Sequence, residues 1–468
     1  MGSNLIGSFQ TRVNRYNPFG VEGDFASANP RASSLTPAGG AFVAGPNGVI
    51  IGNFAWVGTD GRTVSSSGQT VAEPDGFVHR DQQGLLTEYL QAAGTLIPPG
   101  FPVTLMTRGE FLDKNTGPSS IAKGATLYAS FADGSLMSSA GTSASVTATL
   151  GSTNTASLGS TNTASLGATF TASAGSPATQ LVVTAVTGLI SIGDTVSGSG
   201  ITPGTTISSL VSGTPGGAGT YELSAENTCS SATVTCFGST VKVTVTTGLI
   251  SVGDTISGGA GFPVGATIAS QLAGGTPGGA GTYTLSAAGT AYTASATGVT
   301  TFGDVVKVTA VSTYISVGDT ITGGAGFPSA ATTVTAQTSG TGGSTGTYTL
   351  SNRGTAYTAS ATGVLTFGIT VAVTAVGSGS LAAGLPIADA THSSYLPTGA
   401  ILEAQINGTT GLTGIYALNA AYPATQYSAG DNLTTTAGIA LTNWSPIPLE
   451  AGVAAGVGEL VQITTWGN

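Results

Sequence analysis

Near-identical segments recur in the middle of this chain at a fixed spacing. The octapeptide Thr-Pro-Gly-Gly-Ala-Gly-Thr-Tyr stands at residues 214–221 and again at 276–283. Phe237, Phe302 and Phe367 end three successive units and lie 65 residues apart. Self-similarity at such a period is typical of modules that stack on one another, so it favours a projecting structural element over a protein built around a cleft.

The composition predicts an all-β fold. Charged residues make up only 7% of the chain, against roughly 25% in an ordinary soluble domain. Glycine supplies 73 of the 468 residues without a Gly-X-Y period, which excludes collagen. Thr and Val suit a pleated surface, and glycine suits turns. The net charge of −10 argues against direct nucleic-acid binding, which needs clustered Lys and Arg.

Each repeated unit contains an alternating strand pattern and a Tyr-x-Leu motif. Val241, Val243 and Val245 alternate with polar residues, which places them on one face of a strand. Residues two apart on a strand point to the same side, so we expect each Tyr and Leu to fill the small core of its module. The motifs are Tyr221/Leu223, Tyr283/Leu285, Tyr348/Leu350 and, in a divergent fourth unit, Tyr416/Leu418.

The stretch before the repeats is a duplication of eight residues, since Gly151–Leu158 recurs at once as Gly159–Leu166. We interpret this low-complexity polar sequence as a linker, with a thin stacked β-element as the alternative. The last thirty residues change character again, and we expect them to return to the N-terminal sheet. The predicted division is a base β-domain with an N-terminal arm (1–140), a linker (141–179), β-repeats (180–238, 239–303 and 304–368), a divergent fourth repeat (369–438) and C-terminal strands of the base (439–468).

Within the base, the sequence predicts a β-hairpin. Residues 41–44 and 49–57 have strand patterns, and the intervening Gly-Pro-Asn-Gly is a turn sequence. Further strands are predicted at 101–112 and 125–131. The base is therefore expected to be a compact β-domain, split between the two ends of the chain.

Nothing in the sequence predicts export. The first eighteen residues lack the apolar core of a signal peptide, and no apolar run reaches the roughly 18 residues that span a bilayer. Cys229 and Cys236 are too few for a disulfide framework. We expect free thiols, because the aligned repeats carry Ala294 and Thr301 at these positions. Synthesis in a reducing host cytoplasm is therefore expected.

No residue cluster predicts catalysis. His79 and His392 are the only histidines, and we interpret them as structural or solvent-facing. Asp194, Asp254 and Asp319 recur at one module position, which raises calcium binding as a hypothesis. Each module supplies only one such carboxylate, so we favour an aspartate that accepts backbone hydrogen bonds in its own turn. The sequence thus predicts no enzyme activity, no catalytic residue, no metal and no cofactor.

Aromatic residues leave a sugar-binding role open. Trp444, Trp466, Tyr292 and Tyr357 could stack on sugars if exposed, with burial as packing residues the alternative. An adhesin or fibre-like protein that binds host-surface glycans through its repeats is therefore a second functional hypothesis. An enzyme acting on polysaccharide needs paired carboxylates in a cleft, and the sequence nominates no such pair.

The run Asn-Pro-Phe-Gly-Val-Glu-Gly-Asp-Phe-Ala-Ser-Ala-Asn-Pro-Arg occupies residues 17–31, and Val49–Val57, Gly124–Ser135 and Gly458–Trp466 accompany it. These segments resemble the structural cement, or capsid decoration, proteins of tailed bacteriophages. The resemblance covers residues 1–140 and 439–468. The chain departs from the family's short form by a long insertion between these two segments.

The resemblance implies a homo-oligomer, often a trimer, on the exterior of the virion capsid. Such proteins clamp neighbouring subunits of the major capsid protein against the pressure of packaged DNA. The repeats would form an outward knob or spike, and neither a membrane nor nucleic acid would be a direct partner. The candidate capsid contacts lie on the N-terminal arm, with simple solvation of its charges as the alternative: Arg12, Arg15, Asn17, Phe19, Glu22, Asp24, Phe25 and Arg31.

Overall fold

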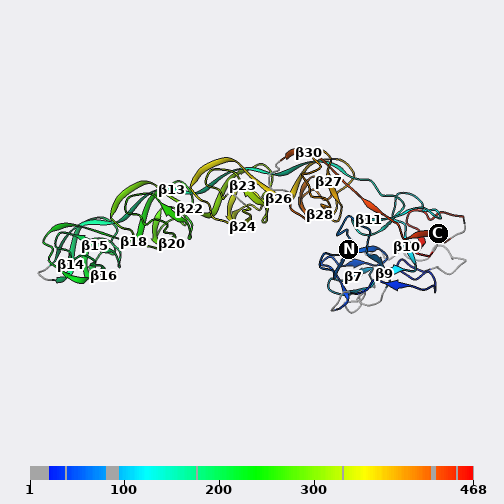
Figure 1. Ribbon diagram of the computed structural model, residues 1–468, viewed down its shortest axis with the longest axis horizontal. Coiled ribbons are helices and arrows are strands. Elements are labelled where there is room, and N and C mark those ends of the chain that lie inside the picture. Colours follow the sequence, from blue (N-terminus) through cyan, green and yellow to red (C-terminus); the bar gives the residue numbers. More distant parts are fainter. Residues whose placement is uncertain are drawn as a thin grey trace, which may run out of the picture. The chain divides into compact units, whose positions relative to one another are not determined.

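A computed structural model describes residues 20–36, 40–80, 94–174, 178–272, 274–328, 331–422, 428–449 and 452–466. These residues form strands, turns and irregular segments, which confirms the predicted all-β class (Figure 1). In this described part, no helix is long and apolar enough to cross a membrane. The chain divides into two compact units: unit 1 (residues 1–150, 369–423 and 428–468) and unit 2 (residues 151–368 and 424–427).

Short strands build the base in unit 1. A seven-stranded sheet has the order β1-β9-β6-β4-β5-β2-β8, two three-stranded sheets have the orders β10-β33-β32 and β12-β11-β31, and β3 pairs with β7. The bounds are β1 (Ala32–Ser33), β2 (Phe42–Ala44), β3 (Val49–Ile50), β4 (Phe54–Val57), β5 (Thr63–Ser65), β6 (Gly76–Val78), β7 (Leu96–Ile97), β8 (Pro102–Val103), β9 (Leu105–Arg108), β10 (Glu110–Lys114), β11 (Leu127–Ser130), β12 (Leu136–Met137), β31 (Gly438–Leu441), β32 (Ser445–Pro448) and β33 (Leu460–Thr464).

The C-terminal segment pairs with N-terminal strands, as the sequence analysis predicted. β33 is antiparallel to β10, with Phe111 opposite Ile463. β31 is antiparallel to β11, and Ile121 forms an isolated bridge with Ala455. Both ends of the chain therefore build one base.

Aromatic side chains join the sheets of the base. The ring centroid of Trp444, just after β31, lies 5.5 Å from that of Phe54, 5.9 Å from Phe111 and 6.2 Å from Phe77. These spacings are typical of favourable aromatic pairs. Trp444 is only 8% exposed, so most of its ring packs in the core of the base. The core of the base thus needs side chains from both ends of the chain.

The predicted hairpin at residues 41–57 forms its turn but not its strand pairing. The Gly48 N–H donates to the Gly45 carbonyl oxygen at 2.9 Å. However, β2 pairs with β5 and β8, and β3 pairs with β7. Gly52 has a φ of +83°, which glycine adopts readily and which divides the predicted second strand into β3 and β4. The hairpin prediction is therefore wrong.

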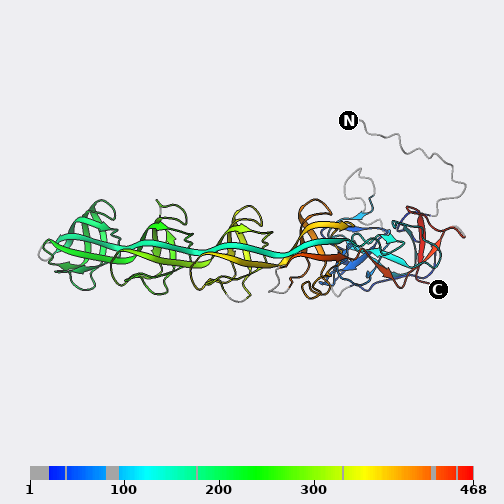
Figure 2. The same ribbon diagram turned by 90° about the horizontal axis from the view of Figure 1, so that it is seen from above.

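In unit 2, the long strands β18, β22 and β26 run antiparallel to one continuous strand, β13 (Figure 2). We call residues 178–238, 239–303 and 304–368 the first, second and third modules. Their strands are β13 (Ser145–Ala174), β14 (Ala178–Gly188), β15 (Thr195–Gly198), β16 (Ile207–Gly213), β17 (Gly219–Asn227), β18 (Ala232–Thr246), β19 (Thr255–Ser257), β20 (Ile268–Gln271), β21 (Gly281–Leu285), β22 (Thr293–Val311), β23 (Thr320–Thr322), β24 (Val334–Gly340), β25 (Gly346–Leu350) and β26 (Thr358–Ser378).

Residues 145–174 of the low-complexity segment form the strand β13, so the alternative interpretation as a β-element is confirmed and the linker interpretation of residues 141–179 is wrong. β13 pairs with β18 over residues 162–172 and with β22 over residues 154–166. Where the two ranges overlap, strands on both edges satisfy its backbone N–H and C=O groups. This support holds a polar sequence of Ser, Thr, Asn and Ala in extended form despite its weak strand propensity.

Glycines divide β13 into octads, which we define as residues 151–158, 159–166 and 167–174. Gly151, Gly159 and Gly167 open them, with φ between +75° and +76°. The pairing register of β13 shifts at Gly159 and at Gly167. A glycine with positive φ inside a strand is typical of a β-bulge, which bends the strand and increases its twist. A methyl group at Gly159 would also overlap the Thr301 carbonyl oxygen, so only glycine fits there.

Each octad supplies apolar side chains to one module. Ala164 and Leu166 pack in the core of the second module, beside Tyr283. At the same positions of the preceding octad, Ala156 and Leu158 pack in the core of the third module. Eight strand residues span about 26 Å, which is the advance along β13 from one core to the next. The eight-residue duplication and the 65-residue period therefore belong to one structural repeat.

The Tyr-x-Leu motifs are buried, as predicted. The four tyrosines are 1–2% exposed and the four leucines 3–5%. Each tyrosine hydroxyl donates to a carbonyl oxygen of the preceding turn, which ties the turn to the core. The bonds are Tyr221 to Gly217 (2.7 Å), Tyr283 to Gly279 (2.6 Å), Tyr416 to Leu412 (2.7 Å), and Tyr348 to Ser344.

The recurring aspartates close their own turns, which confirms that interpretation. Asp194, Asp254 and Asp319 each accept a hydrogen bond from the backbone N–H three residues earlier, at 2.7–2.8 Å. Burial raises the pKa of Asp194, and it raises that of Asp254 to about 6.

Cys229 and Cys236 are buried and free, as predicted, and the Cys236 thiol contacts Asp194 Oδ2 at 3.3 Å.

The two compact units have other bounds than the predicted domains. The predicted domain bounds themselves stay a prediction. Residues 369–422, most of the predicted fourth repeat, lie in unit 1 with the base. Tyr416 is opposite Val371 there, as Tyr348 is opposite Val306 in the third module. The strands of this fourth module are β27 (Ile387–Asp389), β28 (Leu402–Gly408), β29 (Gly414–Leu418) and β30 (Ser428–Thr435).

Candidate functional site

Half of the predicted contact residues lie in the part of the chain that the structure describes. Arg12, Arg15, Asn17 and Phe19 lie outside the described residues. The others lie on residues 20–33, which we call the arm segment: Glu22, Asp24, Phe25 and Arg31.

The arm segment is hydrogen-bonded to an edge of the base. The Gly23 N–H donates to the Leu112 carbonyl oxygen (2.8 Å), and the Leu112 N–H donates to the Asp24 carbonyl oxygen (2.9 Å). The Ala26 N–H donates to the Glu110 carbonyl oxygen (3.0 Å). β10 therefore has backbone partners in both β33 and the arm segment, and the arm segment is a fixed part of the base.

Phe25 and Arg31 are exposed side chains of the arm segment that contact one another. The guanidinium carbon of Arg31 lies 3.7 Å from the centroid of the Phe25 ring, and the His79 ring stacks on Phe25 at 5.1 Å. Phe25 is still 40% exposed. A cation over an aromatic face is worth about 0.5–1 kcal/mol at an exposed site. The pair is thus a cationic and apolar surface group that is ordered before any partner binds.

Glu22 and Asp24 are engaged within the base. Asp24 Oδ2 accepts a backbone N–H of the arm segment at 3.0 Å. Glu22 packs against Gly52; burial raises the pKa of Glu22, and the nearby Lys114 opposes that rise. Asp113 is fully buried, which raises the pKa of its carboxyl well above the usual range. Glu22 and Asp24 already have contacts within unit 1, so Phe25 and Arg31 are the more suitable contact residues.

A pocket of about 430 Å³ lies beside the arm segment, and the sequence analysis missed most of its lining. Thr107 and Arg108 of β9 line it, and the Thr107 hydroxyl donates to the Ala32 carbonyl oxygen at 3.3 Å. Trp444 and Trp466 line it from the C-terminal segment. The walls come from distant stretches of the chain, so no local pattern in the sequence marks them.

Residues 9–192 match a family model described as XM1 gp53 minor capsid protein. This match supports a structural protein of a bacteriophage capsid. The matched range includes the arm segment, strands β1–β12 of the base, β13 and β14. No curated protein and no solved structure matches the chain.

The residues proposed for glycan contact are not assembled into a site. Tyr292 and Tyr357 are only partly exposed. Burial raises the pKa of Tyr292, and the Tyr357 hydroxyl lies 3.3 Å from the Thr247 hydroxyl. Trp466 is 40% exposed but belongs to the base. The host-glycan hypothesis stays a prediction.

Proposed function

We propose that the chain is a capsid cement protein whose base binds the outer surface of the shell and bridges neighbouring subunits of the major capsid protein. The observation that carries the proposal is the exposed Phe25–Arg31 pair on an arm segment fixed to a base that both chain ends build. The family match over residues 9–192 supports the capsid role.

The proposed contact needs several copies of the chain, because one copy buries too little area. A standard protein interface buries about 800 Å² on each partner, and one Phe25–Arg31 pair with its pocket is a small part of that area. A homo-oligomer, such as a trimer, presents several copies at once, and linked contacts raise avidity by about 10²–10⁴. The positive charge of Arg31 suits an acidic group on the capsid surface.

The modules of unit 2 suit a knob or spike directed away from the shell. Only nine Asp, Glu, Lys and Arg residues occur between residues 151 and 368, and three of them are the buried turn aspartates. Such a surface offers little long-range attraction to a charged partner. We therefore assign capsid binding to the base and projection to the modules.

A sedimentation assay tests the capsid contact. The purified chain should sediment with phage particles that lack it, and Arg31→Glu should weaken this binding by about tenfold or more, because it reverses the charge held over Phe25. Lys242→Glu is the matched control: it makes the same charge change at an exposed site on β18, and binding should be unchanged. Equal binding by the two variants, or no binding by the unaltered chain, would contradict the proposed contact.

A further inference from the structure

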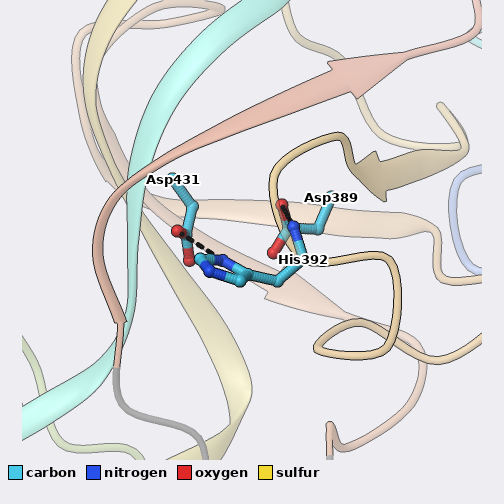
Figure 3. Close-up of side chains that lie close together, drawn as sticks. All are labelled: Asp389, His392 and Asp431. Atoms are coloured by element: carbon cyan, nitrogen blue, oxygen red, sulfur yellow. Dashed lines mark hydrogen bonds and ion pairs between the residues drawn. The ribbon is translucent and has the colours of Figure 1, made fainter.

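Three side chains with metal-binding groups lie together in the fourth module: Asp389, His392 and Asp431 (Figure 3). Asp389 ends β27, Asp431 lies in β30, and the two strands are paired. One potential ligand atom of each side chain lies within 4.8 Å of those of the other two. We propose that this cluster binds a divalent transition-metal ion of the Zn²⁺ class.

Two carboxylate oxygens of the cluster lack a hydrogen-bond donor. Asp389 is 5% exposed and Asp431 is 2% exposed. Asp389 Oδ1 accepts the N–H groups of Thr391 (2.8 Å) and His392 (2.9 Å), and Asp431 Oδ1 accepts the Ser428 hydroxyl (2.9 Å). The Oδ2 atom of each aspartate is buried without such a partner. Leaving a buried carboxylate oxygen unpaired is costly, and one cation can satisfy both.

The charges in the cluster also favour a cation. Two carboxylates held this close repel one another when ionised, and the repulsion grows as water is excluded. His392 Nδ1 lies 3.0 Å from Asp431 Oδ1, and Figure 3 shows the carboxyl groups of both aspartates near its ring. A single protonated histidine offsets one negative charge, whereas a divalent ion offsets two.

The donor atoms select the class of metal. Mg²⁺ and Ca²⁺ prefer ligand sets made of oxygen, whereas one imidazole with two carboxylates suits Zn²⁺ and neighbouring transition metals. Three protein ligands leave a fourth position for water, and the His392 side chain is 39% exposed. A metal bound at His392 Nδ1 takes the place of the contact between Nδ1 and Asp431 Oδ1, and the neutral imidazole then carries its proton on Nε2.

The cluster is specific to the fourth module. The Ile387 N–H in β27 donates to the Ala400 carbonyl oxygen, as the Val196 N–H in β15 donates to the Thr205 carbonyl oxygen. Ile387 and Val196 are therefore equivalent, so Asp389 stands where the first module has Gly198. A buried aspartate at this position is therefore not required by the module fold. A metal there would tie the loop after β27 to β30, which itself pairs with residues 145–150 of β13.

Zn²⁺ titration of the EDTA-treated full-length chain, followed by calorimetry, tests the site. One Zn²⁺ per chain should bind, and Asp431→Asn and His392→Gln should each weaken binding by about tenfold or more. Asp254→Asn is the matched control, because Asp254 is also buried with an oxygen that lacks a hydrogen-bond partner but has no such cluster around it. Its Zn²⁺ affinity should equal that of the unaltered chain.

Circular dichroism establishes that each variant is folded before titration. If Asp431→Asn does not fold, His392→Gln decides, since the histidine is half-exposed and contributes little to the core. Failure of the intact chain to bind Zn²⁺, or unchanged affinity in His392→Gln, would overturn the site. Tighter binding of Ca²⁺ than of Zn²⁺ would overturn the class of metal. Neither result depends on the proposed capsid role.

Discussion

Replacing Gly159 by alanine is expected to disrupt the junction between β13 and β22. The φ of Gly159 is +75°, and the added methyl group would overlap the backbone carbonyl oxygen of Thr301. The two strands cannot move apart easily, because β13 pairs with β22 on both sides of Gly159. We expect a loss of more than about 4 kcal/mol in the free energy of unfolding of the neighbouring modules, a size that is exceptional for one methyl group.

Gly298→Ala provides the matched control for Gly159→Ala. Gly298 lies in β22 with a φ of +74°, and a methyl group there has no atom within 4 Å. It should cost only the strain of a left-handed alanine, about 1–2 kcal/mol. Hydrogen exchange followed by mass spectrometry can measure both variants. Loss of amide protection confined to β13, β19 and β22 in Gly159→Ala is the expected result; equal losses in the two variants would contradict the role given to the bulge.

Replacing Trp444 by alanine is expected to destabilise the base strongly. The side chain is buried among Phe54, Phe77 and Phe111, and removing a core tryptophan typically costs about 3–5 kcal/mol. The total stability of a domain is often only about 5–15 kcal/mol. The near-ultraviolet circular dichroism of the base and its urea midpoint should therefore fall together.

Trp466→Ala separates packing from surface effects. Trp466 comes from the same C-terminal segment but is 40% exposed, so its replacement should change stability by about 0.5 kcal/mol or less. The same urea titration measures both variants. Equal destabilisation by Trp444→Ala and Trp466→Ala would show that the C-terminal segment is not part of the core of the base.

The fold class and the module cores could be predicted from sequence because they depend on local patterns. Alternation placed Val241 and Val243 on a buried face, and the spacing of Tyr283 and Leu285 placed both in one core. Val245, predicted on the same face, is 57% exposed, because the register with β13 shifts between Val243 and Val245. The role of the octads could not be predicted in the same way. Their strand conformation comes from flanking strands that are far away in the sequence, because the Gly and Asn residues of the octads disfavour a strand.

The pairing in the base was harder to predict because its strands are short. Most have two to five residues, so long-range partners decide which sheet each strand joins. The general return of the C-terminal segment could be inferred from its change in composition, but the register of Phe111 opposite Ile463 could not.

In the candidate sites, too, contacts between residues that are distant in sequence could not be predicted. Phe25 and Arg31 are close in sequence and were both predicted, whereas His79, which stacks on Phe25, comes from a distant strand end. His392 was predicted to be structural or solvent-facing, and its contact with Asp431, which is 39 positions away, could not be predicted. Only the pairing of β27 with β30 brings the two together.

The central claim is that the base, rather than the modules, binds the capsid. A deletion of residues 151–368, closed by an Asn-Gly turn, separates the two. The two ends of the deleted segment lie close together within unit 2, because a methyl group built on Gly151 would lie 2.7 Å from the Thr366 carbonyl oxygen. A short turn can therefore join them. Near-ultraviolet circular dichroism of Trp444 and its neighbours reports whether the shortened base is folded.

Sedimentation of this deletion variant with phage particles that lack the protein is the most direct measurement. We predict that the folded variant binds with an affinity close to that of the full chain and competes with it for the same sites. A folded variant that no longer sediments with particles would contradict the account. So would full binding by a fragment that carries only the modules, because the contact would then lie in unit 2.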